Sequence, residues 1–180
     1  PGIVHRLDKE TSGVLILAKT EKAGKEILRQ FREREQEKRY LAIVSLPVDP
    51  PAGFCEHRLL RNAKTNKSSV AEKGKVARLS YRVAGRGERY AMLEVELLTG
   101  RHHQIRAQLS AVGHPIRGDL KYGAPRSQQG GGIALHAVSI RCVDPGSGKE
   151  AFIVASPPDE RLWNDLYPSY EPGAPWPEVG

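Results

Sequence analysis

The sequence predicts an α+β fold, in which a mixed, largely antiparallel sheet is flanked by helices. Segments with strand character follow one another in adjacent runs, instead of alternating strictly with helical segments. The chain has 180 residues, of which 39% are hydrophobic, and this is enough to bury a substantial core. No internal repeat or long low-complexity stretch interrupts it. We therefore expect one domain over residues 1–180.

The first elements expected are a strand, a helix and a second strand. Residues 14–18 form a short apolar run with β-branched members, which is typical of a buried strand. Residues 20–38 favour a helix that begins at the N-cap Thr20 and carries one apolar stripe. That stripe comprises Ala23, Ile27, Leu28 and Phe31. Residues 39–46 are expected to form a strand that stops at Pro47.

The middle of the chain is expected to be rich in strands. Residues 54–60 favour a short strand, and the polar, basic segment 61–75 is typical of an exposed loop or a hairpin. Residues 76–85 and 89–98 predict two further strands. Only Arg-Gly-Glu separates these two strands, so we expect them to pair as a hairpin.

The remaining segments predict a helix, two strands and a short last helix. The helix covers residues 102–113 and is closed by Gly113, because glycine readily ends a helix in a left-handed conformation. Its inner face is expected to carry Ile105, Leu109 and Val112. After it come a strand at 133–144, a turn with a partner strand at 146–158, a helix at 158–167 and a loosely ordered tail from about 168 to 180.

The charge distribution favours a polyanionic partner. The formal net charge is +7, and residues 58–78 hold seven Lys or Arg and one acid, Glu72. From residue 156 to 180 the sign reverses, with five acids and only Arg161 basic. A solvated basic surface is the plain alternative, but the clustering favours a stripe that faces nucleic-acid phosphates.

The hydrophobic pattern and the cysteines bear on the cellular compartment and on membrane association. No run approaches the roughly 20 apolar residues that would span a bilayer, and no charged-then-apolar leader opens the chain. Cys55 and Cys142 lie far apart and lack metal-ligand spacing. We expect reduced thiols in a cytoplasmic protein, with a single disulfide as the alternative. A monomer is the default expectation.

The segment Val-His-Arg-Leu-Asp-Lys-Glu-Thr-Ser-Gly, residues 4–13, crowds His5, Arg6 and Asp8 ahead of three small residues. Its letters are similar to the protein-kinase catalytic loop, but no glycine-rich phosphate loop precedes it and the order of Leu and Asp is wrong. The plain alternative is a surface turn with an Asp–Arg pair. In either case the small residues let the loop turn into the next strand, and we expect the Thr11 hydroxyl to bond to backbone.

A second motif runs from Leu97 to Gly123, with the expected order strand, tight turn at Gly100 and helix. His102 and Arg106 are four residues apart, so on a helix they would share a face. Arg101 lies at the beginning of that helix. Taken singly, each histidine here is more often a structural residue than a catalyst.

Together these segments resemble the pseudouridine synthases, in the RluA-type branch that acts on ribosomal and transfer RNA. Residues 2–20 look like the catalytic aspartate loop with the strand after it, and residues 38–44 look like the tyrosine strand. Residues 97–123 look like the arginine-bearing helix, and residues 133–140 look like a late core strand. The resemblance is spread over about three quarters of the chain, in the family's order.

The resemblance implies an enzyme that isomerises specific uridines in rRNA or tRNA to pseudouridine, without a cofactor. Asp8 would be the carboxylate that either attacks C1′ or removes the 2′ proton, and these alternatives stay open. Arg106 would grip Asp8 with two hydrogen bonds and hold its pKa down. Tyr40 would stack on the target base and relay the C5 proton, with an ordinary sheet tyrosine as the alternative.

Further residues are expected to bind the RNA or to shape the site. The expected RNA-binding residues are His5, Arg6, Thr11, Arg101, His102 and Gln104. The uridine must be unstacked to reach a buried carboxylate, and the loop around Asp8 is expected to hold it. Leu135 or Ile133 is a candidate to pack under the base, and His136 is expected to be structural. The histidines lack partners at metal-ligand spacing, so no metal is expected.

The start of the chain qualifies these expectations. Members of the family carry further strands before the aspartate loop, and often a small RNA-binding domain, whereas only seven residues precede Asp8 here. We therefore expect a single catalytic domain whose fold lacks its first strands. The alternative function is a catalytically silent RNA-binding module of the same fold, and a protein-interaction domain is a weaker alternative. Either would lack the isomerase activity.

Overall fold

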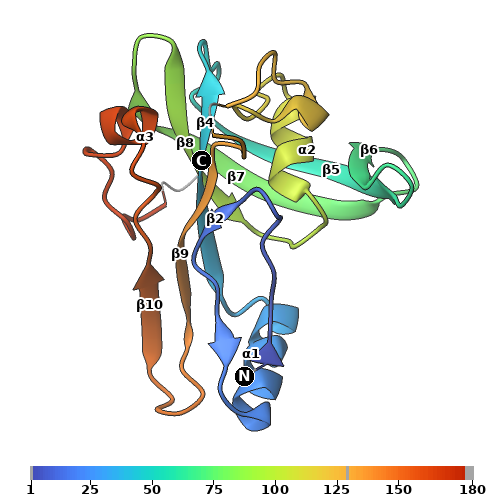
Figure 1. Cartoon of the computed structure of the whole chain (residues 1–180). Coiled ribbons are helices and arrows are strands. Elements are labelled where there is room, and N and C mark those ends of the chain that lie inside the picture. The colour runs from blue at the N-terminus through green and yellow to red at the C-terminus, as the bar shows by residue number, and fades with distance from the viewer. Residues whose placement is uncertain (1, 129, 177–180) are drawn as a thin grey trace.

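The computed structural model describes residues 2–128 and 130–176 (Figure 1). Its strands are β1 (Gly2–Ile3), β2 (Ser12–Gly13), β3 (Leu17–Ala18), β4 (Glu37–Ser45), β5 (Ala52–Asn62), β6 (Lys67–Val70), β7 (Lys75–Arg86), β8 (Tyr90–Leu97), β9 (Leu135–Val143) and β10 (Glu150–Val154). Its helices are α1 (Glu21–Glu33), α2 (Gln104–Ala111), the 3-10 turn η1 (Leu120–Tyr122) and α3 (Arg161–Leu166). Within the described ranges, no helix is both long and apolar enough to cross a bilayer.

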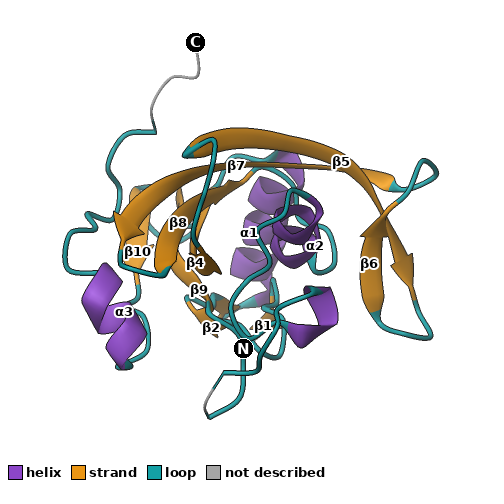
Figure 2. Cartoon of the chain, turned by 90° about the horizontal axis from the view of Figure 1, so that it is seen from above, coloured by secondary structure: helices purple, strands orange, loops and turns teal. Residues whose placement is uncertain are grey.

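The main sheet has the strand order β10-β9-β4-β8-β7-β5-β6, and every neighbouring pair along it is antiparallel. The short strand β2 adds a parallel pairing to β9. The predicted fold class, α+β with a mixed and largely antiparallel sheet flanked by helices, is therefore confirmed. Figure 2 shows the sheet curving around α1 and α2, with α3 on its other side. Sheets of this size twist and curl, and this curvature gives the molecule a concave side.

The core lies where β4 and β8 cross the middle of the sheet. Leu41, Ile43, Met92 and Leu93 have no exposed surface, and the helices add Leu109 and Trp163. Burial of large apolar side chains on both sheet and helices is what stabilises such a layered domain. Val112 is 37% exposed, so its predicted place on the inner face of α2 is wrong. Gly113 follows the helix with φ +87°, as predicted for its closing residue.

The expected strand at 14–18 is wrong. Leu15 and Leu17 are 48% and 52% exposed, and only Leu17–Ala18 of this segment forms a strand, β3, while β2 precedes the segment and has a different partner. Strand β2 pairs with β9, whereas β3 pairs with β1 in a separate two-stranded sheet. Between them the backbone N–H of Ile16 donates to His5 Nε2 at 2.8 Å, so a side chain replaces a ladder hydrogen bond. An apolar run in the sequence predicts burial, but it cannot show that the segment lacks one continuous partner strand.

Gly13 is the residue that lets the loop enter the sheet. Its φ is +119°, and a Cβ at this position would lie 2.2 Å from the carbonyl oxygen of Ala137 on β9. A side chain here would collide with backbone, so only glycine allows this approach. The imidazole of His136 fixes the same junction, because Ser12 Oγ lies 2.9 Å from its Nδ1 and its Nε2 lies 2.9 Å from the carbonyl oxygen of Ala155. These bonds agree with the structural role expected for His136.

Helix α1 begins as predicted but packs with a different stripe. The Thr20 hydroxyl accepts a hydrogen bond from the N–H of Ala23 at 3.2 Å, which is the N-cap arrangement. Ile27 is buried, but Leu28 is 49% exposed, so its predicted place in the stripe is wrong. Gln30 is fully buried instead. Its amide exchanges two hydrogen bonds of 3.0 Å with the backbone of Val143, and this pairing makes the buried polar group tolerable.

The basic segment after β5 forms a hairpin, one of the two expected alternatives. Strand β5 is longer than predicted and pairs with both β6 and β7. The β5–β6 hairpin projects from one end of the sheet (Figure 1). The predicted hairpin of β7 and β8 is present as well.

The segment after α3, where a loosely ordered tail was expected, makes defined contacts as far as Trp176. Tyr170 donates to the fully buried Glu94 at 2.8 Å. Arg39 also pairs with Glu94, and it donates to the carbonyl oxygen of Ala174 at 2.5 Å. The Trp176 ring lies over Arg39, 5.5 Å from its guanidinium carbon. Residues 177–180 lie outside the described ranges.

Candidate active site

The aspartate loop, β4 and the turn before α2 meet around one cleft of about 400 Å³. Asp8 comes from the loop, Tyr40 from β4 and Arg106 from α2, and all three line this cleft. The other side chains that line it are His5, Arg6, Leu7, Thr11, Lys38, Arg61, Leu97, Arg101, His102, His103, Gln104, Ile105 and Leu135. All nine residues predicted to form the site therefore border the same space.

Asp8 has an environment that disfavours its ionised form. Its side chain is 23% exposed, and burial raises the pKa of the carboxyl above its ordinary value. The nearby charge of Arg106 acts in the opposite direction, and those of His102 and Arg6 help it. We expected a cation to hold this pKa down; the cation is present, but burial outweighs it. A carboxylate with a raised pKa is a stronger base and nucleophile once it is ionised.

Arg106 approaches Asp8, but it grips another acid. Its Nη1 lies 3.7 Å from Asp8 Oδ2, which is an ion pair without a direct hydrogen bond. The bidentate grip expected on Asp8 is made on Asp119, with Nε to Oδ2 at 2.7 Å and Nη2 to Oδ1 at 2.9 Å. Asp119 and Arg106 are both buried. This pairing fixes the guanidinium plane and leaves Nη1 on the side of the cleft.

Tyr40 lines the cleft in its neutral form. Burial, together with the charge of Asp8, raises the pKa of its phenol to about 12. Near neutral pH the hydroxyl therefore keeps its proton and is both a donor and an acceptor. Leu135 on β9 lines the same cleft, whereas Ile133 does not.

Several of the predicted RNA-binding residues are tied to the protein. His5 Nε2 accepts from the N–H of Ile16, and burial, followed by the charge of Lys38, lowers the pKa of His5 to about 4. The Thr11 hydroxyl has no hydrogen-bond partner among the described residues. Its expected bond to backbone is therefore wrong, although its N–H donates to the carbonyl oxygen of Asp8 at 2.9 Å. A buried hydroxyl without a partner is available to a ligand. Arg6 is exposed at the edge of the cleft.

The other three, Arg101, His102 and Gln104, lie in the turn before α2 and at the first residue of that helix. Helix α2 begins at Gln104, so the expectation that His102 and Arg106 share one helical face is wrong. His102 Nδ1 lies 3.0 Å from Ser68 Oγ, and Arg101 Nε donates to the carbonyl oxygen of Val76 at 2.9 Å. Gln104 is 3% exposed, and its amide bonds to Thr99, to the Arg101 N–H and to the Arg78 carbonyl. Gln104 therefore braces the turn, and an RNA contact through this buried amide stays a prediction.

Four charged or polar residues of the site escaped the sequence reasoning. Lys38 lines the cleft two residues before Tyr40, and the period of two along a strand could have revealed it. Glu10 Oε2 lies 3.4 Å from Arg106 Nη1, and His103 Nε2 lies 3.3 Å from the same nitrogen. Asp119 completes the set. No local pattern points to the last three, because their partners are distant or depend on the turn geometry.

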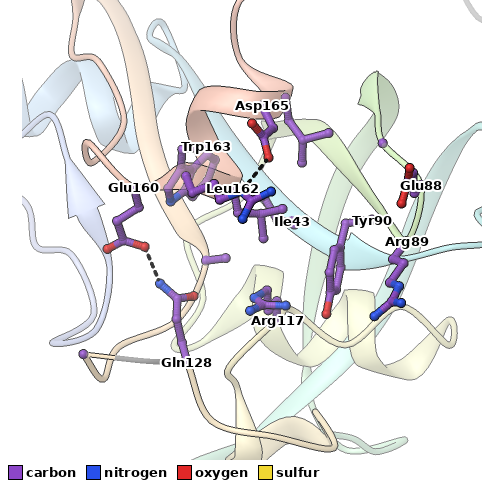
Figure 3. A pocket seen from close by; sticks show the side chains of 15 residues that line it. Ile43, Glu88, Arg89, Tyr90, Arg117, Gln128, Glu160, Leu162, Trp163 and Asp165 are labelled. Carbon is purple, nitrogen blue, oxygen red and sulfur yellow. Dashed lines mark hydrogen bonds and ion pairs between the residues drawn. The ribbon is translucent and has the colours of Figure 1, made fainter.

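A larger cavity, of about 1040 Å³, lies elsewhere and shares no residue with this cleft (Figure 3). Residues of α3, β4 and β8 line it, and Arg117 stacks over the Tyr90 ring at 4.6 Å. Gln128 donates to Glu160 across it at 2.8 Å. Acidic and basic side chains both line this cavity, but they do not point toward one common position. None of the predicted site residues lines it. Over residues 2–128 and 130–176, no three His, Cys, Asp or Glu side chains gather as a metal site would need.

Comparison with known proteins identifies the family to which this chain belongs. Residues 1–111 match the model of the RNA pseudouridylate synthase family. The dual-specificity RNA pseudouridine synthase RluA of Escherichia coli is 36% identical over 149 residues, which are 81% of this chain and 68% of that protein. The ribosomal large subunit pseudouridine synthase D of Nitrosomonas europaea is 36% identical over 88% of this chain and 48% of that protein. The chain belongs to the RNA pseudouridylate synthases, in their RluA-type branch.

Solved structures agree with this assignment. Human RNA pseudouridylate synthase domain containing 1 has a TM-score of 0.79 and 27% identity, over 92% of this chain and 73% of that one. The human RNA pseudouridylate synthase domain containing 4 protein has a TM-score of 0.75 and 26% identity.

An RNA pseudouridine synthase of Aquifex aeolicus is 43% identical, but the match covers 40% of its length. The chain spans about half the length of the curated relatives that it matches.

Proposed function

We propose that this chain is an RNA pseudouridine synthase that isomerises specific uridines in rRNA or tRNA, with Asp8 as the reacting carboxylate. One observation carries the proposal: a half-buried carboxylate faces a fixed guanidinium and a neutral phenol across one cleft. In the reaction, the C1′–N1 bond breaks, the base turns over, a C1′–C5 bond forms, C5 loses its proton and N1 takes one up. Substrate and product are isomers, so the chemistry consumes no co-reactant.

Asp8 has two chemically sound roles. It adds to C1′ as N1 departs and leaves again as C5 bonds there, or it removes the 2′ proton as N1 departs, so that a glycal forms, and returns that proton when C5 adds. Both roles need the ionised carboxylate, and both benefit from the raised pKa that burial imposes. Arg106 opposes this rise, so it keeps the carboxylate available to react at neutral pH.

Tyr40 is proposed to stack against the base and to move the C5 proton at the end of the reaction. A phenol with a pKa near 12 is scarcely ionised at neutral pH, so it cannot wait as a free phenolate base. It can relay the proton by accepting one while it gives up its own. Leu135 lies at the same cleft and offers the base an apolar contact.

The basic hairpin of β5 and β6 is proposed to bind the phosphates around the target uridine. Arg61 of this hairpin lines the cleft, and Lys64 and Lys67 lie further along it. Lysine and arginine side chains that neutralise phosphates provide affinity without reading sequence. The Thr11 hydroxyl, which has no hydrogen-bond partner among the described residues, and the exposed Arg6 line the cleft and are proposed to hold the flipped nucleotide.

The chain is proposed to act as one catalytic domain and as a monomer in a cytoplasm. Two buried free cysteines, Cys55 and Cys142, fit a reducing compartment. Size-exclusion chromatography with light scattering tests the oligomeric state, and a dimer mass would contradict a monomer.

The test is pseudouridine mapping on unmodified rRNA and tRNA transcripts incubated with the 180-residue chain. The Asp8→Asn variant should form no product while it still binds the RNA. Asp165→Asn is the matched control, because that side chain is 61% exposed and borders the other cavity. Product from Asp8→Asn at the wild-type rate would refute the role of Asp8. RNA binding by the wild type without product on any transcript would favour the silent module instead.

A further inference from the structure

His103 occupies a strained position beside the two charged groups of the cleft. Its φ is +50°, in the left-handed region that non-glycine residues rarely adopt, and it forms the N-cap of α2. Its side chain makes no capping hydrogen bond and is 7% exposed. A buried polar ring at a strained residue is stable only if its partners hold it firmly.

The partners of this ring define which nitrogen carries the proton. Arg106 Nη1 lies 3.3 Å from His103 Nε2, and a guanidinium can only donate, so Nε2 must be the acceptor. The proton of a neutral ring then sits on Nδ1. His103 Nδ1 lies 2.8 Å from the Tyr122 hydroxyl, which takes that proton as a hydrogen-bond acceptor. Burial, followed by the positive charge of Arg106, lowers the pKa of His103 to about 3, in agreement with a neutral ring.

His103 completes the coordination of Arg106. Asp119 holds the Nε and Nη2 side of the guanidinium, so only Nη1 remains to face the cleft. His103 takes that nitrogen on one side, while Glu10 at 3.4 Å and Asp8 at 3.7 Å face it with their carboxylates. The Tyr122 ring also lies against the guanidinium, 5.0 Å from its carbon. His103 therefore helps to hold the planar guanidinium in the position in which Nη1 faces the two acids.

The ring is anchored in turn by the basic hairpin. Ser68 on β6 donates its N–H to the Tyr122 hydroxyl at 2.8 Å. Its hydroxyl lies 3.0 Å from His102 Nδ1 and donates to the His102 carbonyl oxygen at 2.7 Å. The His102 ring stacks on His103 with centroids 3.7 Å apart. Ser68 is 2% exposed, so these bonds form a buried link between the hairpin and the cleft.

We propose that His103 is a positioning residue of the isomerase site, whose Nδ1–H imidazole directs Arg106 Nη1 at Asp8 and makes that geometry depend on the docking of the β5–β6 hairpin through Ser68 and Tyr122. The inference rests on the proposed function for its kinetic consequence, but its proton placement stands apart from activity. A hairpin that binds RNA phosphates would thereby also set the catalytic geometry. His103 has no proton to give Asp8, because its cleft-facing nitrogen is an acceptor.

The kinetic test compares His103→Phe with His103→Gln on unmodified rRNA and tRNA transcripts. Phenylalanine keeps the ring stacked on His102 but accepts nothing, whereas the glutamine oxygen can accept near the place of Nε2. We expect His103→Phe to lower kcat about ten- to a hundred-fold with little change in KM, as for the loss of a hydrogen bond to a charged group. His103→Gln should recover most of that loss. Unchanged kcat in a folded His103→Phe protein would overturn the proposal.

The second test needs no activity. Long-range ¹H–¹⁵N NMR of the 180-residue chain reports the tautomer of each histidine, and His103 should carry its proton on Nδ1. The Tyr122→Phe variant removes the acceptor at Nδ1 and should weaken that preference. A proton on Nε2 in the wild type would overturn the proposal. If the wild type makes no pseudouridine, the proposed function fails, while this measurement still decides where the His103 proton lies. If His103→Phe does not fold, the His103→Gln and Tyr122→Phe variants decide the proposal.

Discussion

Asp119 holds the guanidinium of Arg106 with two hydrogen bonds, of 2.7 and 2.9 Å, and both side chains are almost fully buried. The arginine that faces Asp8 is thus fixed by a different acid. Under the proposed function this arrangement separates two roles, since Asp119 holds the guanidinium in place and Asp8 is left to react. A reacting carboxylate that was itself gripped by two hydrogen bonds would be a weaker base.

Removal of Asp119 should destabilise the fold. In Asp119→Asn the buried guanidinium loses its charged partner, and breaking such a pair costs about 3–5 kcal/mol. Denaturant unfolding measures this free energy. Glu10→Gln is the control, because Glu10 is 42% exposed to solvent and exposed pairs contribute only about 0–1 kcal/mol. Equal losses in the two variants would show that the buried pair has no special weight.

The pH dependence of activity should follow the charges around Asp8. The proposed reaction needs ionised Asp8, so kcat/KM should fall as the pH drops through the pKa of this carboxyl. The charge of Glu10 raises that pKa, so Glu10→Gln should move the acid limb to lower pH. Arg6 lowers the same pKa, so Arg6→Gln should move the limb to higher pH. Shifts in the same direction in both variants would contradict the assignment of this limb to Asp8.

Gly13→Ala should be far more harmful than Gly113→Ala. Both glycines have positive φ, so alanine strains the backbone at either place, at a cost of about 1–3 kcal/mol. At Gly13 the new Cβ would also meet the Ala137 carbonyl at 2.2 Å, whereas at Gly113 nothing lies within 4 Å. We expect a further loss of about 1–3 kcal/mol at Gly13, measured by denaturant unfolding. Equal losses would mean that the loop shifts away from β9 without cost.

Tyr40→Phe separates stacking from proton transfer. The variant keeps a ring against the base but loses the hydroxyl, so RNA affinity should stay within about threefold while kcat falls at least tenfold. Single-turnover kinetics and filter binding measure the two quantities. Tyr90→Phe serves as the control, because that ring lies in the other cavity against Arg117. A wild-type kcat in Tyr40→Phe would leave Tyr40 with a packing role alone.

The salt dependence of RNA binding should show whether the β5–β6 hairpin contacts RNA phosphates. Arg61→Gln should weaken binding evenly across transcripts and flatten the plot of log K against log salt by about one unit of slope. Arg161→Gln is matched in chemistry, but its side chain is 95% exposed on α3, and it should leave the slope unchanged. Equal slopes in all three proteins would place the RNA elsewhere.

The sequence predicted the elements whose cause is local. Thr20 caps α1 because its hydroxyl meets an N–H three residues on, and the β7–β8 hairpin follows from two strand patterns around a short turn. The meeting of Asp8, Tyr40 and Arg106 came from resemblance to a family, since no spacing rule brings such distant residues together. The three side chains line one cleft in the structure, and their roles remain predictions.

The misses share a physical cause, which is dependence on distant partners. Gln30 is buried in place of Leu28 because its amide pairs with the backbone of Val143. Helical periodicity in the sequence cannot reveal a hydrogen-bond partner at the end of a distant strand. Asp119 appears in the sequence as an ordinary acid beside a glycine. Residues 14–18 failed as a strand because the chain divides its pairing between two sheets.

Arg39 and Tyr40 are neighbours on β4, and the pairing register with β9 shifts between them. Tyr40 points into the cleft, while Arg39 is clasped by Glu94, Ala174 and Trp176 on the other face. Successive side chains of a strand point to opposite faces of the sheet. The single peptide unit between Arg39 and Tyr40 therefore connects the cleft to the C-terminal segment around Trp176. Under the proposed function, substitutions around Trp176 should therefore change kcat through the position of the Tyr40 phenol, although Trp176 does not line the cleft.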